Sequence, residues 1–104
     1  MAEIPVYMVV NLSVTDAKTY RHYEKGFFPL LKKYKAEFIT YDHQPITFEG
    51  KAPRSGRMII FSFPSEQAAK NWYADNDYQA ISEFRRAGTE MEFLTLVHGL
   101  PPRK

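Results

Sequence analysis

With 104 residues, the chain is long enough for one domain and too short for two. Its 14 basic and 12 acidic residues leave a net charge of only +2 and form no basic face, which argues against nucleic-acid binding. Cysteine is absent, which excludes disulfides, thiolate catalysis and cysteine-based zinc sites.

The N-terminal residues 1–5 lack the basic stretch and long apolar run of a signal peptide. No apolar run elsewhere is long enough to span a bilayer, so we expect a cytoplasmic protein with no membrane contact. One domain is expected over residues 1–100, followed by a flexible tail at 101–104 that begins with two prolines.

The first half of the chain predicts a strand followed by a helix. β-branched and aromatic residues favour a strand over residues 6–12, and Thr15 or Asp16 can cap the helix that follows. Spacings of three and four place five large residues on one helical stripe: Tyr20, Tyr23, Phe27, Leu30 and Tyr34. Because Pro29 lies within this stripe near Gly26, we expect either one kinked helix or two helices that meet there.

The middle of the chain predicts two more strands. Residues 37–42 alternate as a strand does, and residues 43–45 interrupt the pattern. Residues 46–50 are expected to continue the strand direction after a bulge or turn, and 51–56 to form a loop. The most hydrophobic strand of the chain follows at residues 57–63.

The last part predicts two helices and a strand. Ser65 is the expected cap of a helix whose apolar face consists of Ala68, Ala69, Trp72 and Tyr73. Residues 75–77 break that helix. A short third helix then carries Tyr78, Ile81 and Phe84 and ends near Gly88, before a final strand over residues 90–98.

This order of elements predicts an α+β fold of the ferredoxin-like type, βαββαβ, with an antiparallel sheet and an extra short helix after the second main helix. Helices would cover one face of the sheet. Yet residues 6–12, 58–63 and 91–97 are apolar at both odd and even positions, so the second face should be covered as well. We expect a homodimer with two sheets face to face; the alternative is a monomer covered by its own loops.

The sequence also resembles the domain-of-unknown-function 1330 family of the dimeric α/β-barrel superfamily. The resemblance is carried by residues 63–73, by Tyr78-Gln79-Ala80-Ile81 and by Arg85. Further matching positions are Val9 to Leu12, Val14 to Asp16, Tyr20, Tyr23, Pro29 to Leu31, Lys33 and Tyr34.

This resemblance implies the fold and the dimer, and it implies little about function. Related dimeric barrels include cofactor-free monooxygenases, haem-dependent decolorising enzymes, chlorite dismutases and binding proteins, so the fold alone transfers no activity. The chain departs from the family at residues 42–45, where a glycine-rich turn is usual.

Histidines offer no metal motif, because His22, His43 and His98 lack the close spacing of a ligand pair. We expect no metal and no cofactor. His43 is the best polar candidate for a catalytic role, because it follows a strand end beside Asp42, which can orient its imidazole. The alternative is a surface histidine in a turn.

Arg85 is the second catalytic or binding candidate, because it adjoins an apolar helical stripe and can bind a carboxylate bidentately. The favoured alternative is a structural ion pair with Asp75, Asp77 or Glu83. The candidates for binding a small ligand are the lone strand amide and four aromatic residues: Asn11, Tyr23, Tyr41, Trp72 and Tyr78.

These observations leave three functional hypotheses open. The first is a dimer that binds a small apolar or acidic metabolite. The second is a cofactor-independent monooxygenase or isomerase that uses His43, Arg85 and Asn11, although no catalytic triad or phosphate-binding loop is present. The third is a purely structural dimerisation module.

Overall fold

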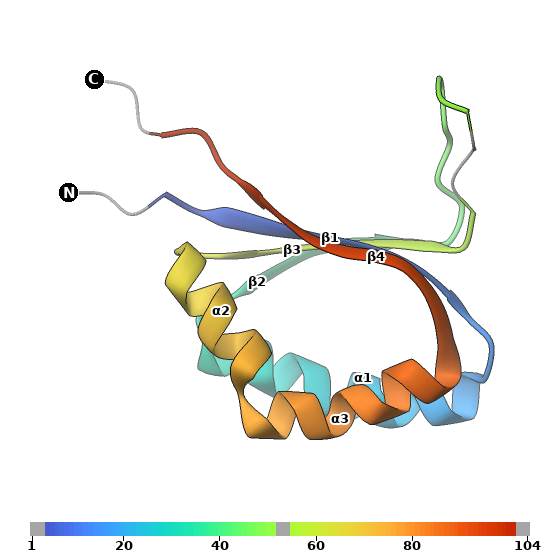
Figure 1. The fold of residues 1–104 in the computed structure, drawn as a ribbon, viewed down its shortest axis with the longest axis horizontal. Helices are drawn as coiled ribbons and strands as arrows, with labels where there is room; N and C mark the ends of the chain where they lie inside the picture. Colours follow the sequence, from blue (N-terminus) through green and yellow to red (C-terminus); the bar gives the residue numbers. More distant parts are fainter. Residues whose placement is uncertain (1–3, 52–54, 102–104) are drawn as a thin grey trace.

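The computed structural model describes residues 4–51 and 55–101, within which a four-stranded sheet carries three helices on one side (Figure 1). The elements follow the chain in the order β1 (Val6–Val14), α1 (Ala17–Lys33), β2 (Glu37–Asp42), β3 (Arg57–Phe63), α2 (Glu66–Ala74), α3 (Asn76–Gly88) and β4 (Thr89–His98). Residues 102–104 of the expected tail lie outside the described residues.

The sheet has the strand order β2-β3-β1-β4, and each neighbouring pair is antiparallel. This is the ferredoxin-like βαββαβ arrangement with one additional helix, so the predicted fold is confirmed. One part of the prediction is wrong: α3, the additional helix, spans 13 residues and is longer than the nine-residue α2. Tertiary packing accounts for its length, because α3 lies along α1 and shares its buried face with it.

Helix α1 is one continuous helix, and the two-helix alternative is wrong. Asp16 caps it by accepting hydrogen bonds from the amide and the hydroxyl of Thr19. Pro29 lies inside the helix, where it removes one backbone hydrogen bond. Phe27 and Leu30 are buried on either side of it, and this packing holds the helix together.

Two aromatic residues of the predicted helical faces are not in the core. Tyr73 at the end of α2 and Phe84 on α3 are both more than two-fifths exposed, whereas Trp72 and Tyr78 are fully buried. Sequence spacing predicted that all four lie on apolar helical faces. The neighbouring elements cover only two of them, because spacing along one helix does not say where the next helix lies. Ser65 caps α2 as predicted, by accepting a hydrogen bond from the amide of Ala68.

Residues 43–51, which follow β2, do not form a strand, so the prediction for residues 46–50 is wrong. Pro45 has no amide to give to a ladder, and Gly50 has a φ of 138° that strands do not use. This segment rises from the sheet on the side away from the helices (Figure 1).

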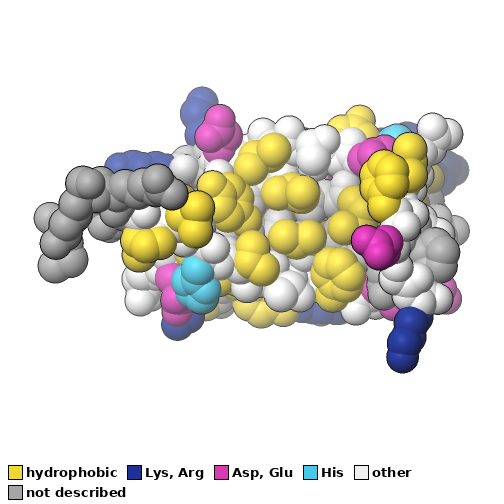
Figure 2. Space-filling view, turned by 90° about the horizontal axis from the view of Figure 1, so that it is seen from above, with side chains coloured by type: hydrophobic (Ala, Val, Ile, Leu, Met, Phe, Trp, Pro, Cys, Tyr) yellow, Lys and Arg dark blue, Asp and Glu magenta, His cyan; other side chains and the backbone are white. Residues whose placement is uncertain are grey.

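The second face of the sheet carries no helix and is largely apolar, as expected from the strand composition. Alternation along the strands turns Tyr7 and Val9 of β1 away from the helices, and the antiparallel register places Val97 and Ile60 opposite them. Figure 2 shows this open face, where hydrophobic side chains gather in the middle and most charged ones lie toward the margins. None of the helices within residues 4–51 and 55–101 combines the length and apolarity that a membrane span requires.

Candidate functional site

A cavity of about 180 Å³ lies between the sheet and the helices. Its walls are mainly apolar and come from α1 and from the helix-facing side of the strands: Val10, Leu12, Phe27, Phe38, Ile59 and Phe61. The strands place these residues there because alternate positions of β1 and β3 point toward the helices. Such a hollow suits the hydrophobic part of a small molecule.

Arg85 is the deepest charged group of the cavity. Its side chain lines the wall from α3 and is only 5% exposed, yet its Nε atom has no hydrogen-bond partner. One guanidinium nitrogen, Nη1, donates weakly to the Met91 sulfur at 3.5 Å, and the group lies 5.7 Å from the centre of the Tyr23 ring. Among the described residues no carboxylate pairs with it.

The ion pair that the sequence favoured for Arg85 is therefore wrong. Asp75 pairs with Lys33 instead, and Glu83 pairs with Arg86, one position along α3. Arg85 faces inward because it shares the buried side of α3 with Tyr78 and Ser82, while Arg86 lies on the exposed side. A buried guanidinium without a counter-ion is costly, so a ligand anion would satisfy it.

Tyr23 lines the cavity, and its hydroxyl oxygen lies 2.9 Å from that of Tyr78, so one hydroxyl donates to the other. Burial, with a contribution from Tyr78, raises the pKa of Tyr23 well above its ordinary value. Tyr23 therefore stays protonated at neutral pH and offers a hydroxyl rather than a base.

A second arginine, Arg57, lies at the cavity wall and was not among the sequence candidates. Its guanidinium lies over the rings of Tyr20 and Tyr41, at 5.6 and 5.1 Å from their centres. Nη1 lies 3.5 Å from a carboxylate oxygen of Glu24. Burial raises the pKa of Tyr20 to about 12, so this side chain also stays neutral. One signal in the sequence could have found Arg57: it is a charged residue at the start of the most hydrophobic strand.

The remaining sequence candidates lie elsewhere. Asn11 is buried, and its side-chain amide donates to the backbone carbonyls of Ser55 and Arg57, on the sheet face turned away from the cavity. Trp72 is fully buried, and its ring lies 4.1 Å from that of Tyr78 behind the cavity wall. His43 is exposed and packs edge-on against Tyr41 at 5.2 Å.

A second hollow, an open groove of about 470 Å³, lies between α2 and β4, and Arg85 lines it as well. Its other charged residues satisfy one another: Glu66 pairs with Lys70 at 2.6 Å and with His98 at 2.7 Å. Hydrogen bonds from Lys70 and then His98 lower the pKa of Glu66 to about 2. This groove thus offers no unpaired charge of its own apart from Arg85.

Neither hollow has the features of a metal centre. Within the described parts of the chain, no three histidine, aspartate or glutamate side chains are close enough together to hold an ion. The lining residues with polar side chains are instead two arginines, three tyrosines and one glutamate: Arg57, Arg85, Tyr20, Tyr23, Tyr41 and Glu24. Because Glu24 lies 3.5 Å from Arg57, the guanidinium group of Arg85 is the one of the two left without a carboxylate from the described residues. Guanidinium groups and tyrosine hydroxyls bind anions and hydrogen-bond acceptors.

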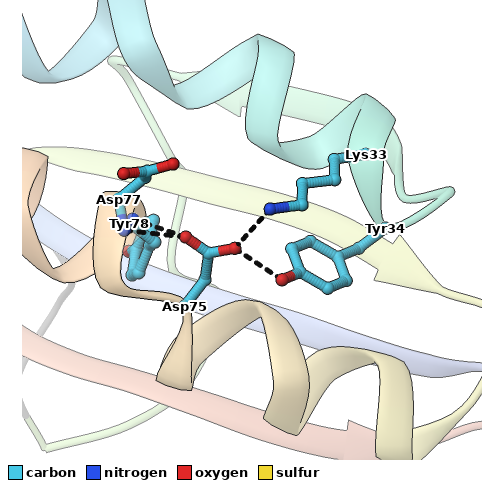
Figure 3. Close-up of polar contacts among 5 residues, drawn as sticks. All are labelled: Lys33, Tyr34, Asp75, Asp77 and Tyr78. Atoms are coloured by element: carbon cyan, nitrogen blue, oxygen red, sulfur yellow. Dashed lines mark hydrogen bonds and ion pairs between the residues drawn. The ribbon is translucent and has the colours of Figure 1, made fainter.

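Asp75, the residue between α2 and α3, connects these helices to the end of α1 (Figure 3). One carboxylate oxygen of Asp75 accepts hydrogen bonds from the Tyr34 hydroxyl at 2.5 Å and from Lys33 at 2.9 Å, at the end of α1. The other accepts from the amides of Asp77 and Tyr78 and so caps α3. These contacts hold the pKa of Asp75 well below its usual range, first through Tyr34 and then through Lys33.

Comparison with solved structures shows the same fold in several proteins. The methylated protein RPA0582 from Rhodopseudomonas palustris superposes with a TM-score of 0.76 at 20% identity, over 98% of this chain and 85% of that one. SnoaB from Streptomyces nogalater, a cofactor-independent oxygenase, superposes with a TM-score of 0.63 at 11% identity, over 97% of this chain and 96% of that one. HapK from Hahella chejuensis superposes with a TM-score of 0.61 at 8% identity, over 95% of this chain and 96% of that one.

These identities are low and show the fold alone. No curated protein matches the chain in sequence. A family model does match it, over residues 5–100, and that model describes a domain of unknown function, DUF1330. The chain therefore belongs to the DUF1330 family.

Proposed function

We propose that this protein is a homodimer that binds a small aromatic or branched apolar carboxylate in the cavity between sheet and helices, with Arg85 as the anchor for the carboxylate. One observation carries the proposal: Arg85 is buried, lines an apolar cavity and has no counter-ion among the described residues. A bidentate carboxylate would occupy the free Nε and an adjacent nitrogen of its guanidinium group.

The size of the cavity limits the ligand. An apolar protein cavity of about 150 Å³ holds a benzene molecule. The cavity beside Arg85 measures about 180 Å³, which leaves room for one ring and a small substituent. Its aromatic walls favour a flat or compact apolar group, and Tyr23 adds one hydroxyl. The ligand class is thus a single-ring or short branched acid.

The charge of the cavity favours an anion over a neutral molecule. Arg85 and Arg57 both line it, and Glu24 is the acidic residue among its lining residues. Glu24 lies 3.5 Å from Arg57, so it offsets that charge only in part and leaves Arg85 uncompensated. In a poorly hydrated site such an excess of positive charge attracts a carboxylate strongly.

The homodimer is supported by the open sheet face. Its apolar side chains have no cover within the described residues (Figure 2). Large contiguous apolar patches of this kind are uncommon on monomeric proteins. A second copy with the same face is the simplest cover, because a two-fold axis brings two identical apolar faces together.

A cofactor-independent oxygenase is the second candidate. Its support is the likeness to SnoaB, which is one of fold. An oxygenase of this kind would hold an oxidisable aromatic anion in the same cavity, so the site is shared by both candidates. Oxygen consumption with electron-rich phenolic acids, followed with an oxygen electrode, separates turnover from binding alone.

The binding proposal is tested with two carboxylates and with a neutral amide of nearly the same shape as one of them. Benzoate and cyclohexanecarboxylate should raise the thermal unfolding midpoint, and the neutral benzamide should not. At about a hundred times its dissociation constant, a ligand adds roughly 2.7 kcal/mol to the free energy of unfolding. Isothermal titration calorimetry checks the stoichiometry of one ligand per chain.

Arg85→Met should abolish the response to carboxylates, and Arg86→Met on the exposed side of the same helix is the matched control. Because Arg85→Met removes an uncompensated buried charge, the free variant should unfold no more easily than the wild type. If no carboxylate binds, or if binding survives Arg85→Met, the proposal is wrong.

A further inference from the structure

We infer that residues 43–51, called the arm below, pack onto a second copy of this chain and complete its dimer interface. This inference rests on the homodimer proposed above and adds to it the element that extends the contact beyond the sheet. The arm rises from the sheet on the open side, opposite the helices, at the end of the sheet far from the start of β1 (Figure 1).

The arm presents two large apolar side chains to solvent. Phe48 is 92% exposed and Ile46 is 79% exposed, the first and the third most exposed among the large hydrophobic residues described. Burial of such side chains is favourable, because it removes a large apolar area from water. Two of them on one short projecting segment indicate a surface that becomes covered.

The base of the arm is held in place on both sides. At its start, the amide of Gln44 donates to the Asp42 carboxylate at 2.8 Å. On the return, the Asn11 side chain donates to the carbonyls of Ser55 at 2.9 Å and Arg57 at 3.2 Å. The direction in which the arm leaves the sheet is thus set by hydrogen bonds to β1 and β2.

Gly56 fixes the same direction through its backbone. It has a φ of 78°, and an added Cβ would lie 2.6 Å from the Leu12 carbonyl oxygen. Glycine is the residue that tolerates both conditions. The buried Asn11, which the sequence marked as a ligand candidate, therefore has a structural explanation: it holds the backbone of Ser55 and Arg57 at the start of β3.

The area of the sheet explains why an arm is needed. The four strands have 9, 6, 7 and 10 residues and together span a face of only about 500 Å², given a rise of about 3.3 Å per residue and a strand spacing of about 4.8 Å. A stable interface buries about 800 Å² on each partner. A single buried Phe contributes about 150–250 Å², so the arm supplies a large part of the difference.

A second copy fits the arm better than a membrane or an unrelated protein. The arm carries one acidic and one basic residue, Glu49 and Lys51, and so lacks the basic character of a membrane-binding segment. Its two apolar side chains match an apolar face that this same chain presents on the same side. In a two-fold dimer each arm contact forms twice, which doubles its contribution.

The test compares Phe48→Asp with Phe84→Asp by sedimentation velocity and equilibrium. Phe84 is also partly exposed, on α3 in the helical layer, and is therefore the matched control for adding a charge at an exposed Phe. We expect Phe48→Asp to weaken the dimer about a hundredfold and Phe84→Asp to leave it unchanged. Circular dichroism should show the same secondary structure in both variants.

A second measurement uses the absence of cysteine from the chain. Phe48→Cys introduces a single thiol, whose reaction with a disulfide reagent should be slow in the dimer and fast on dilution below the dissociation constant. If the wild type is a monomer, the homodimer proposal fails and the arm inference with it. If the wild type is a dimer that Phe48→Asp does not weaken, or that Phe84→Asp weakens equally, the homodimer stands and the arm inference is overturned.

Discussion

Two tyrosine hydroxyls meet inside this protein where most of the neighbouring side chains are apolar. Tyr23 and Tyr78 come from α1 and α3, and their hydroxyl oxygens lie 2.9 Å apart. Each oxygen satisfies the other in a buried setting, so neither carries a desolvation cost alone. The pair therefore links the two helices and presents a polar point to the cavity through Tyr23.

Removing both hydroxyls should cost less than the two single removals combined. Tyr78→Phe leaves the Tyr23 hydroxyl buried without this partner, and we expect a loss of about 1–3 kcal/mol in the free energy of unfolding. Tyr23→Phe should cost a similar amount, and the double variant clearly less than the two single losses combined. Urea unfolding of the four proteins measures this coupling. Strictly additive losses would show that the two hydroxyls do not depend on each other.

For Arg85, the sequence predicted the residue as a binding candidate but not its partners. Its type and its place beside an apolar stripe were enough to select it as a binding candidate. Its partners were predicted wrongly, because Lys33 from α1 takes Asp75 and the neighbouring Arg86 takes Glu83. Which basic side chain pairs with a given carboxylate depends on which helices are neighbours, and the spacing of residues along one helix does not predict this.

At the scale of elements, Asp75 holds the helical layer together. It caps α3 with one carboxylate oxygen and accepts from Tyr34 and Lys33 of the α1 end with the other (Figure 3). Its pKa lies well below the usual range, through the hydrogen bond from Tyr34 and then that from Lys33. The charged form is thus the one that stabilises the folded state.

Asp75→Asn should reveal this contribution through its pH dependence. A carboxylate whose folded-state pKa is lowered stabilises the fold above the unfolded-state value of about 3.9, and this stabilisation is lost as the pH falls below it. The wild type should therefore be more stable than Asp75→Asn at pH 7, and the difference should shrink as the pH falls below about 4.

Asp77→Asn is the control, because it makes the same charge change on the same turn. Asp77 donates to the Asp75 carboxylate through its backbone amide, which the substitution leaves in place. Chemical unfolding at several pH values measures both differences. A gap between wild type and Asp75→Asn that stays constant down to pH 2 would contradict the assignment of the low pKa to a stabilising carboxylate.

At the scale of the whole molecule, association should contribute to stability. A dimer that forms only from folded chains makes the unfolding midpoint depend on protein concentration. We expect the thermal midpoint to rise by several degrees between about 1 and about 100 μM protein, and to rise much less for Phe48→Asp. Differential scanning fluorimetry using Trp72 and the tyrosines follows both. A midpoint independent of concentration would count against the dimer.

The order of the elements, a helix cap at Thr15 or Asp16, a second cap at Ser65 and the apolar character of both sheet faces could all be predicted from the sequence. These follow from local periodicity and hydrogen bonding, which act between residues near one another in the chain. Three features could be read only from the folded chain: Arg57 lines the same cavity as Arg85, Asn11 donates to the backbone of Ser55 and Arg57, and Phe48 is 92% exposed. Each depends on which strand or helix lies beside which, and that is settled only when the elements pack.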